Sequence, residues 1–204
     1  MAEEETGKIN KFDCILASAR KLIEQEGFSN FTMDKLANNA GVAKGTIYLY
    51  FKDKNDVLEN VLKSGFQTMF SRMADKVEKK ETPEEKIKTL IYENLLYIGE
   101  NKYFFKTVFL DEMHVVFLKK TSQESYNLRR KKYAVFISEI IIKGIDEGIF
   151  KNVLDPLKTG FYLISLIKTN AIYNFRNNHA EFNEDLIKLE SAEIFDIFID
   201  GIKN

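Results

Sequence analysis

The chain has 204 residues, 45% of them hydrophobic and 30% charged, which suits a folded protein of one or two domains and excludes a disordered tail. Its 30 basic side chains against 31 acidic ones give a net charge of −1, which excludes a generally basic surface of the kind that coats nucleic acid. The single cysteine excludes an internal disulfide framework, and the acidic start and short apolar stretches predict a cytoplasmic protein without a membrane-spanning segment.

Apolar residues recur with a period near 3.6 along almost the whole chain, so the sequence predicts an all-α protein of about nine helices. The first helix carries an apolar stripe from Phe12 to Ile23 and is expected to end at Gly27. Both prolines follow capping residues, at Thr82-Pro83 and Asp155-Pro156, and therefore mark helix starts. The remaining helices are expected near residues 33–40, 43–51, 56–77, 83–100, 103–119, 123–146, 156–176 and 184–202.

The two short helices near residues 33–40 and 43–51 have the spacing of a helix-turn-helix. Thr32 is placed to cap the first of them. Ala37 is small where the second helix must approach, and Gly41 can take the positive φ of a tight turn. The inner face of the second helix is expected to consist of Ile47 and Phe51, and its outer face and flanks of Gly45, Thr46, Tyr48 and Leu49, with Tyr50 nearer the core edge.

The charge of this segment favours contact with DNA. From Lys35 to Lys54 there are four lysines and one aspartate, a local charge of +3 in a nearly neutral chain. Gly45 costs roughly 1 kcal/mol against Ala inside a helix, which makes sense if the backbone there must come close to a phosphate. Two alternatives are a plain packing unit and a module that binds another protein, and salt-dependent binding to a defined duplex separates them from a DNA reader.

The run from Thr32 to Lys54 resembles the DNA-binding domain of the tetracycline-repressor (TetR) family of bacterial regulators; it reads TMDKLANNAGVAKGTIYLYFKDK. The resemblance implies phosphate contacts from Thr32, Lys44 and Lys54. It also implies that the second helix enters the major groove with Gly45, Thr46, Tyr48 and Leu49, and that Tyr50 lies at the groove's edge. The sequence departs from the family pattern at Ala43, where a capping Ser or Thr is common, and at Leu49, which can read a base only by apolar contact.

A change of composition near residue 55 divides the chain into a helix-turn-helix DNA-binding domain, 1–55, and a larger helical domain for effector binding and dimerisation, 56–204. The resemblance implies a homodimer that binds a palindromic double-stranded DNA operator. It further implies release of the operator when a small molecule enters the C-terminal domain, which makes the protein a ligand-responsive repressor. We expect no cofactor and no membrane partner.

The C-terminal domain is rich in aromatic residues, and these predict an apolar pocket for an apolar or aromatic effector. Any one of these rings has an alternative role as an ordinary core residue. His114 and Asn170 are the polar residues expected near the pocket, and the alternative for His114 is a satisfied or exposed histidine outside it. The full set of predicted pocket residues is Phe66, Met69, Met73, Tyr97, Phe105, Phe109, His114, Phe136 and Asn170.

The last two predicted helices are amphipathic with wide apolar faces, so two from each subunit can form a four-helix dimer interface, as in the family. The alternative is burial of these faces within one chain. The predicted interface residues are Phe161, Ile164, Ile167, Phe195, Phe198 and Ile202.

An enzyme that acts on the pocket ligand is the main competing class. The chain has two histidines, neither in a Glu-x-x-His pair, and it contains no Cys-x-x-Cys, phosphate-loop or Gly-x-Ser-x-Gly motif. We therefore predict no catalytic residue and no metal site.

Overall fold

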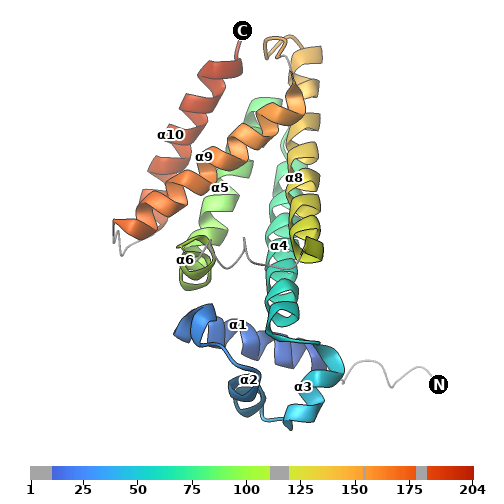
Figure 1. The fold of residues 1–204 in the computed structure, drawn as a ribbon. Coiled ribbons are helices and arrows are strands. Elements are labelled where there is room, and N and C mark those ends of the chain that lie inside the picture. The colour runs from blue at the N-terminus through green and yellow to red at the C-terminus, as the bar shows by residue number, and fades with distance from the viewer. Residues whose placement is uncertain (1–10, 111–119, 154, 178–182) are drawn as a thin grey trace, which may run out of the picture.

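The computed structural model describes residues 11–110, 120–153, 155–177 and 183–204. Over these residues the chain is a stack of helices in two parts, with α1, α2 and α3 in one part and α5 to α10 in the other (Figure 1). Helix α4 runs from the first part into the second. The helices are α1 (Lys11–Asn30), α2 (Met33–Ala40), α3 (Lys44–Tyr50), α4 (Lys54–Glu78), α5 (Pro83–Glu100), α6 (Lys102–Leu110), α8 (Lys120–Asp146), α9 (Pro156–Arg176) and α10 (Glu184–Ile202). The all-α prediction is confirmed.

Local capping explains most helix boundaries. The Thr32 side chain accepts a hydrogen bond from the Lys35 amide, and Gly41 ends α2 in the left-handed region at φ 66°. Thr82 and Glu85 form a reciprocal capping box at the start of α5. Asp155 caps α9 through the Lys158 amide.

Two boundaries differ from the prediction for local reasons. At Gly27 the chain leaves helical geometry, as expected, but a further turn continues α1 to Asn30. Helix α4 begins at Lys54 because the carboxylate of Asp53 accepts hydrogen bonds from the amides of Asn55 and Asp56, at 3.0 and 2.9 Å. The long helix is therefore joined to α3 by only three residues.

Helix α5 lies at the centre of the larger part and contacts α4, α8, α9 and α10 (Figure 1). Its Leu90, Ile91 and Leu95 are fully buried. No helix within the described ranges is both long enough and apolar enough to cross a membrane.

Helices α8 and α9 cross closely because Gly160 has no side chain. A Cβ atom at Gly160 would lie 2.8 Å from the carbonyl oxygen of Ala134 and 3.4 Å from Cβ of Ile137. Ordinary contacts between carbon and oxygen are longer than the first of these distances. The crossing thus holds α8 and α9 at a fixed separation beside the cavity described below.

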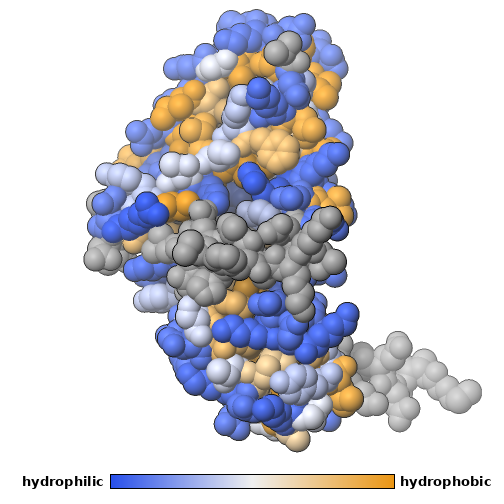
Figure 2. All heavy atoms as spheres, in the orientation of Figure 1, coloured by the Kyte–Doolittle hydropathy of each residue, from blue (hydrophilic) through white to orange (hydrophobic). Residues whose placement is uncertain are grey.

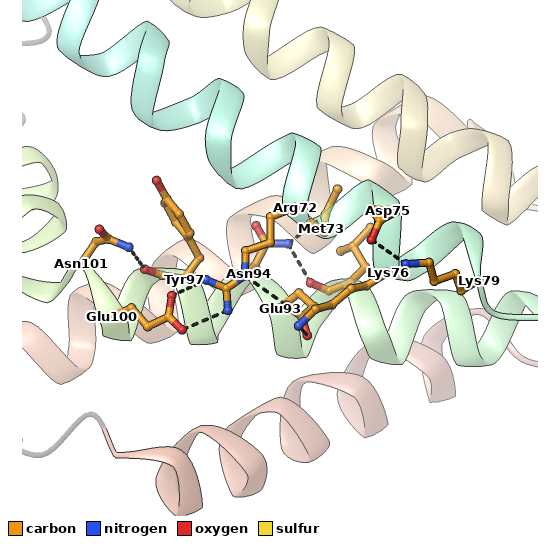
Figure 3. A network of polar contacts seen from close by, with 11 residues as sticks. Arg72, Met73, Asp75, Lys76, Lys79, Glu93, Asn94, Tyr97, Glu100 and Asn101 are labelled. Atoms are coloured by element: carbon orange, nitrogen blue, oxygen red, sulfur yellow. Dashed lines mark hydrogen bonds and ion pairs between the residues drawn. The ribbon is translucent and has the colours of Figure 1, made fainter. Parts of the chain in front are cut away.

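Helices α4 and α5 are joined by a network of ion pairs (Figure 3). Arg72 forms a bidentate pair with Glu100, and Lys76 Nζ lies 2.7 Å from Glu93 Oε1. Glu93 is buried, and within the described part of the chain its second oxygen has no hydrogen-bond partner, although Arg72 Nε lies 3.8 Å away. Breaking this network would leave a buried carboxylate without its countercharges, so it holds the C-terminal half of α4 against α5.

Candidate DNA-binding surface and ligand cavity

Helix α3 is attached to the core by one face and is open to solvent on the other. Ile47 is fully buried, whereas Leu49 is 83% exposed and Tyr48 is 49% exposed. No described atom outside the local backbone lies within 4 Å of a Cβ built at Gly45, so the helix is also open at its N-terminal end. The surface predicted to read bases therefore does not pack into the protein's own interior.

The flanks of α3 agree with the predicted positions of the remaining DNA-binding residues. Tyr50 is 38% exposed and its ring lies 6.2 Å from that of Phe12. Thr46 is half-buried, and Thr32 is exposed at the start of α2. Phe51 stacks under Phe12 at 5.2 Å and anchors the end of α3 in the core, as predicted.

The lysines near this surface are held by partners within the domain. Lys44 Nζ lies 2.7 Å from Asp34 Oδ1, and this hydrogen bond raises the pKa of Lys44. Lys35 pairs with Glu26. Such exposed pairs are weak and exchange readily for a phosphate.

Lys54 has a more enclosed position. Its ammonium donates a hydrogen bond to the carbonyl oxygen of Ser29 at 3.3 Å and lies 4.4 Å from the centre of the Phe28 ring. Partial burial lowers the pKa of Lys54. This lysine therefore fixes the start of α4 against the end of α1, in addition to any contact with DNA.

A cavity of about 140 Å³ lies in the larger part of the molecule, between α4, α5, α6, α8 and α9. Of the predicted pocket residues, Phe66, Met69 and Phe105 are in its wall. Among the residues that the structure describes, the lining consists of Leu62, Phe66, Met69, Asn94, Ile98, Phe104, Phe105, Tyr126, Arg129, Arg130, Tyr133, Ile164, Ile167 and Lys168.

Four of the other predicted pocket residues are not in the cavity wall. Met73 is buried behind it, and Tyr97 donates a hydrogen bond to the Gly65 carbonyl oxygen at 3.2 Å. Phe136 packs edge-on against Phe70, and Asn170 lies 3.4 Å from the amide of Asn174 on the same helix. These four residues lie on the same helices as residues of the cavity wall, but their side chains contact other side chains and do not border the cavity. Phe109 and His114 lie outside the residues whose side chains the structure describes.

The deep part of the wall carries two polar side chains. The amide nitrogen of Asn94 donates to the Leu90 carbonyl oxygen at 2.7 Å and to Met73 Sδ at 3.2 Å. The Tyr133 hydroxyl lies 3.4 Å from the same sulfur. Burial raises the pKa of Tyr133, so its hydroxyl stays protonated and remains a hydrogen-bond donor.

Three cationic side chains also line the cavity, and they are not among the predicted pocket residues. Arg129 Nη1 donates to Ser125 Oγ at 2.7 Å, and burial lowers the pKa of its guanidinium. Arg130 lies 5.8 Å from the centre of the Tyr126 ring. Lys168 comes from α9. The sequence offers one indication of these cations, namely charged residues at or beside the apolar face of a helix. Arg129 precedes the buried Tyr133 by four residues, and Lys168 directly follows the buried Ile167.

Three of the six predicted dimer residues are buried within the chain. Ile167, Phe198 and Ile202 are buried within the chain, so they are core residues and not an exposed interface as predicted. Ile164 lines the cavity, and the Phe161 ring lies under Arg130 at 5.6 Å. Phe195 is half-buried, with Lys88 Nζ 5.9 Å from its ring. The physical reason is that the most apolar face of each helix is used to build the monomer.

A second, less apolar face of α9 and α10 is exposed. Figure 2 shows hydrophobic residues among hydrophilic ones over the upper part of the molecule, where α8, α9 and α10 lie. The large exposed apolar side chains of α9 and α10 are Tyr162, Tyr173, Leu189 and Ile197. None of these four residues is among the predicted interface residues.

Comparison with known proteins shows that the chain is similar to bacterial gene regulators. Residues 15–61 match the model of the family described as bacterial regulatory proteins, tetR family. The chain is 26% identical over 200 residues to the fatty acid metabolism regulator protein of Bacillus subtilis (strain 168). The aligned region covers 95% of this chain and 96% of that protein. Over 144 residues it is 24% identical to the HTH-type transcriptional repressor KstR2 of Mycobacterium tuberculosis (strain ATCC 25618 / H37Rv), covering 69% and 70% of the two chains.

The solved structures agree on the fold. FadR from Bacillus subtilis, in complex with stearoyl-CoA, superposes with a TM-score of 0.82 at 23% sequence identity. The superposition covers 93% of this chain and 98% of that one. The arrangement of the helices is therefore shared over nearly the whole length of both chains.

Proposed function

Residues 15–61 of this chain form a DNA-binding domain of the TetR family of bacterial regulatory proteins, and on that premise we propose that the protein is a ligand-responsive transcriptional repressor. It binds a palindromic operator as a homodimer through α3, and a small molecule in the cavity releases it. The observation that carries the proposal is that α3 is anchored by Ile47 while Tyr48 and Leu49 face solvent.

The DNA-binding part is tested by selecting bound duplexes from a random pool and titrating the best one by fluorescence anisotropy. Tyr48→Ala should reduce the preference for the selected duplex over a scrambled one, by about 5- to 150-fold if a base contact worth about 1–3 kcal/mol is lost. Lys21→Gln, on an exposed position of α1, is the control and should keep the preference. Failure of every duplex to enrich would contradict the proposal.

We propose that the effector is an amphiphile with an apolar tail and an anionic head, of the acyl-CoA class. The support is the lining of the cavity, which combines aromatic and aliphatic walls with Arg129, Arg130 and Lys168. Cations beside an apolar pocket suit a phosphate or carboxylate joined to a hydrocarbon chain. The structure of FadR with stearoyl-CoA shows that this fold takes such a molecule in another protein.

The size of the cavity explains how such a ligand can act on DNA binding. A cavity of this volume holds a molecule about as large as benzene, so a long acyl chain enters only if the walls move apart. Phe66 and Met69 of α4 are in those walls, and α4 leads directly to α3. A ligand that binds the expanded form better shifts the population toward it, and operator and ligand then oppose each other reciprocally.

Stearoyl-CoA, with free CoA as the matched control, tests the effector class. Stearoyl-CoA should release the selected duplex, and free CoA should not, because it cannot open the apolar walls. Arg129→Gln should weaken stearoyl-CoA binding while leaving duplex binding unchanged. Release by both compounds equally, or by neither, would contradict an amphiphilic effector of this class.

We propose that the homodimer forms through the exposed face of α9 and α10. Its support is the set of exposed apolar side chains there, of which Leu189 is 71% and Ile197 is 58% exposed. A two-fold pair of α3 helices reads a palindrome when they stand about 34–36 Å apart, or a multiple of that spacing. Light scattering should give a dimer for the wild type and a monomer for a Leu189→Glu, Ile197→Glu variant, with Tyr103→Glu, on α6, as the control.

A further inference from the structure

We propose that the contact between Arg20 in α1 and Phe104 in α6 couples the cavity to the DNA-binding domain. We call this contact, together with the hydrogen bond from Arg20 to Asn101, the latch. The inference rests on the proposed function, because it assigns a route by which the cavity and the DNA-binding surface are coupled. It adds a contact between α1 and α6 to the covalent connection through α4. Helices α1 and α6 lie next to each other where the two parts of the molecule meet (Figure 1).

Phe104 lies between the cavity and α1. Its ring is buried and forms part of the cavity wall. The guanidinium carbon of Arg20 lies 4.8 Å from the centre of the same ring, the geometry of a cation–π contact. One aromatic side chain thus contacts the DNA-binding domain and borders the site that the effector enters.

A hydrogen bond fixes Arg20 in this position. Its Nη2 atom donates to Oδ1 of Asn101, and its Nε atom donates to Glu24 Oε1 at 3.1 Å. Asn101 is itself held, because its amide nitrogen donates to the Tyr97 carbonyl oxygen at 2.7 Å. The guanidinium therefore joins α1 to the junction of α5 and α6, and it cannot follow the ring without breaking these bonds.

Phe104 also contacts α4, which makes it sensitive to expansion of the cavity. A Cβ atom built at Gly65 would lie 3.6 Å from Cε1 of Phe104. On the other side the ring packs edge-on against Phe105, 5.5 Å away, and Phe105 lines the cavity too. An acyl chain that separates α4 from α6 must therefore move the Phe104 ring, and the contact with Arg20 weakens as the ring moves.

The direction of the effect follows from the geometry. The latched state is the one with the small cavity, so it is the state that binds DNA in a repressor released by its ligand. Filling the cavity breaks the latch and frees α1 from α6. Without the latch, the two parts of the molecule are less firmly joined, and the ligand loses part of its influence on DNA binding.

The test uses Arg20→Gln, with Lys21→Gln as a control that removes the same charge from the neighbouring exposed position of α1. The quantity measured is the ratio of duplex dissociation constants with and without saturating stearoyl-CoA. Allosteric ratios run from roughly 5- to 150-fold, and we expect Arg20→Gln to lower the ratio severalfold, while the part transmitted through α4 remains. Lys21→Gln should keep the wild-type ratio. A wild-type ratio in Arg20→Gln overturns the proposal.

A second measurement keeps the latch testable if the proposed effector or operator is wrong. Ile164→Phe fills the cavity from α9 without any ligand, and it should raise the hydrogen exchange of α1 amides. In the Arg20→Gln variant, by contrast, adding Ile164→Phe should not raise the hydrogen exchange of α1 amides any further. If Ile164→Phe raises the exchange equally with and without Arg20, the latch is refuted, whatever the wild-type protein binds.

Discussion

Gly45 provides a substitution that separates the stability of α3 from its proposed role as the DNA-reading surface. Gly45→Ala adds one methyl group to the exposed side of the helix, at the second helical residue. No described atom beyond the local backbone lies within 4 Å of the new Cβ, so the methyl meets no steric obstacle in the free protein. Any penalty it causes must then come from a partner outside the chain.

The two expected effects have opposite signs. Alanine is favoured over glycine in a helix by at most about 1 kcal/mol, which for a chain of 150–250 residues corresponds to a rise in melting temperature of about 2–4 °C. On DNA, the methyl holds α3 away from the backbone or base edges. Losing one good contact there costs about 1–3 kcal/mol, or about 5- to 150-fold in affinity.

Calorimetry and anisotropy titration at one fixed salt concentration measure the two effects. Gly201→Ala is the matched control, since Gly201 lies in α10 and a Cβ there also meets no described atom within 4 Å. It should leave duplex affinity unchanged. A more stable Gly45→Ala protein that binds the duplex as tightly as the wild type would refute the close approach of α3 to DNA.

Three further substitutions test the charges and the packing. Lys44→Gln should weaken binding to all duplexes and make the slope of log affinity against log salt less negative by about 0.9, since one phosphate contact is lost. An unchanged slope would argue against a phosphate contact from Lys44. Lys54→Met should make the same slope less negative by about 0.9. It should also destabilise the free protein by about 1 kcal/mol, because the cation–π contact with Phe28 is lost. If Lys54 does not contact phosphate, the substitution would change only the denaturation curve and not the slope. Gly160→Ala should cost about 1–3 kcal/mol in urea denaturation because its Cβ would lie 2.8 Å from the Ala134 carbonyl oxygen, and unchanged stability would contradict the close crossing of α8 and α9.

Features that depend on neighbouring residues in the chain were predictable from the sequence. Thr32, Gly41 and the capping box at Thr82 act within one helical turn, and each is in the predicted place. The inward position of Ile47 and the outward position of Leu49 follow from the helical period alone. The start of α4 was placed two residues late because the side chain of Asp53 competes for the cap, and the periodicity of apolar residues does not register it.

The cavity wall was only partly predictable, because neighbouring positions on one apolar face meet different partners. Met69 and Met73 are one turn apart on α4, but Met69 borders the cavity while Met73 accepts hydrogen bonds from Asn94 and Tyr133. Which of them faces the cavity depends on the side chains of the other helices around it. The cations were missed for a related reason, since Arg129 is a charged residue whose role depends on the tertiary position of its helix.

If a ligand fills the cavity as proposed, the restraints around the cavity determine which part of the molecule moves. The close crossing at Gly160 holds α8 and α9 together, and the network of Arg72, Lys76, Glu93 and Glu100 holds the end of α4 against α5 (Figure 3). Because this network lies in the C-terminal half of α4, we expect the N-terminal half, which carries Leu62 of the cavity wall, to be the part that yields.

The length of α4 turns a small movement of that wall into a larger one at the DNA-binding domain. Measured from Arg72, the cavity residue Phe66 lies about 9 Å along the helix, and Lys54 lies about 27 Å along it. A rigid α4 that pivots at Arg72 therefore moves about three times as far at Lys54 as at Phe66. Hydrogen bonds to phosphate tolerate only a few tenths of an ångström, so a shift of about 1 Å at the cavity is sufficient to break them.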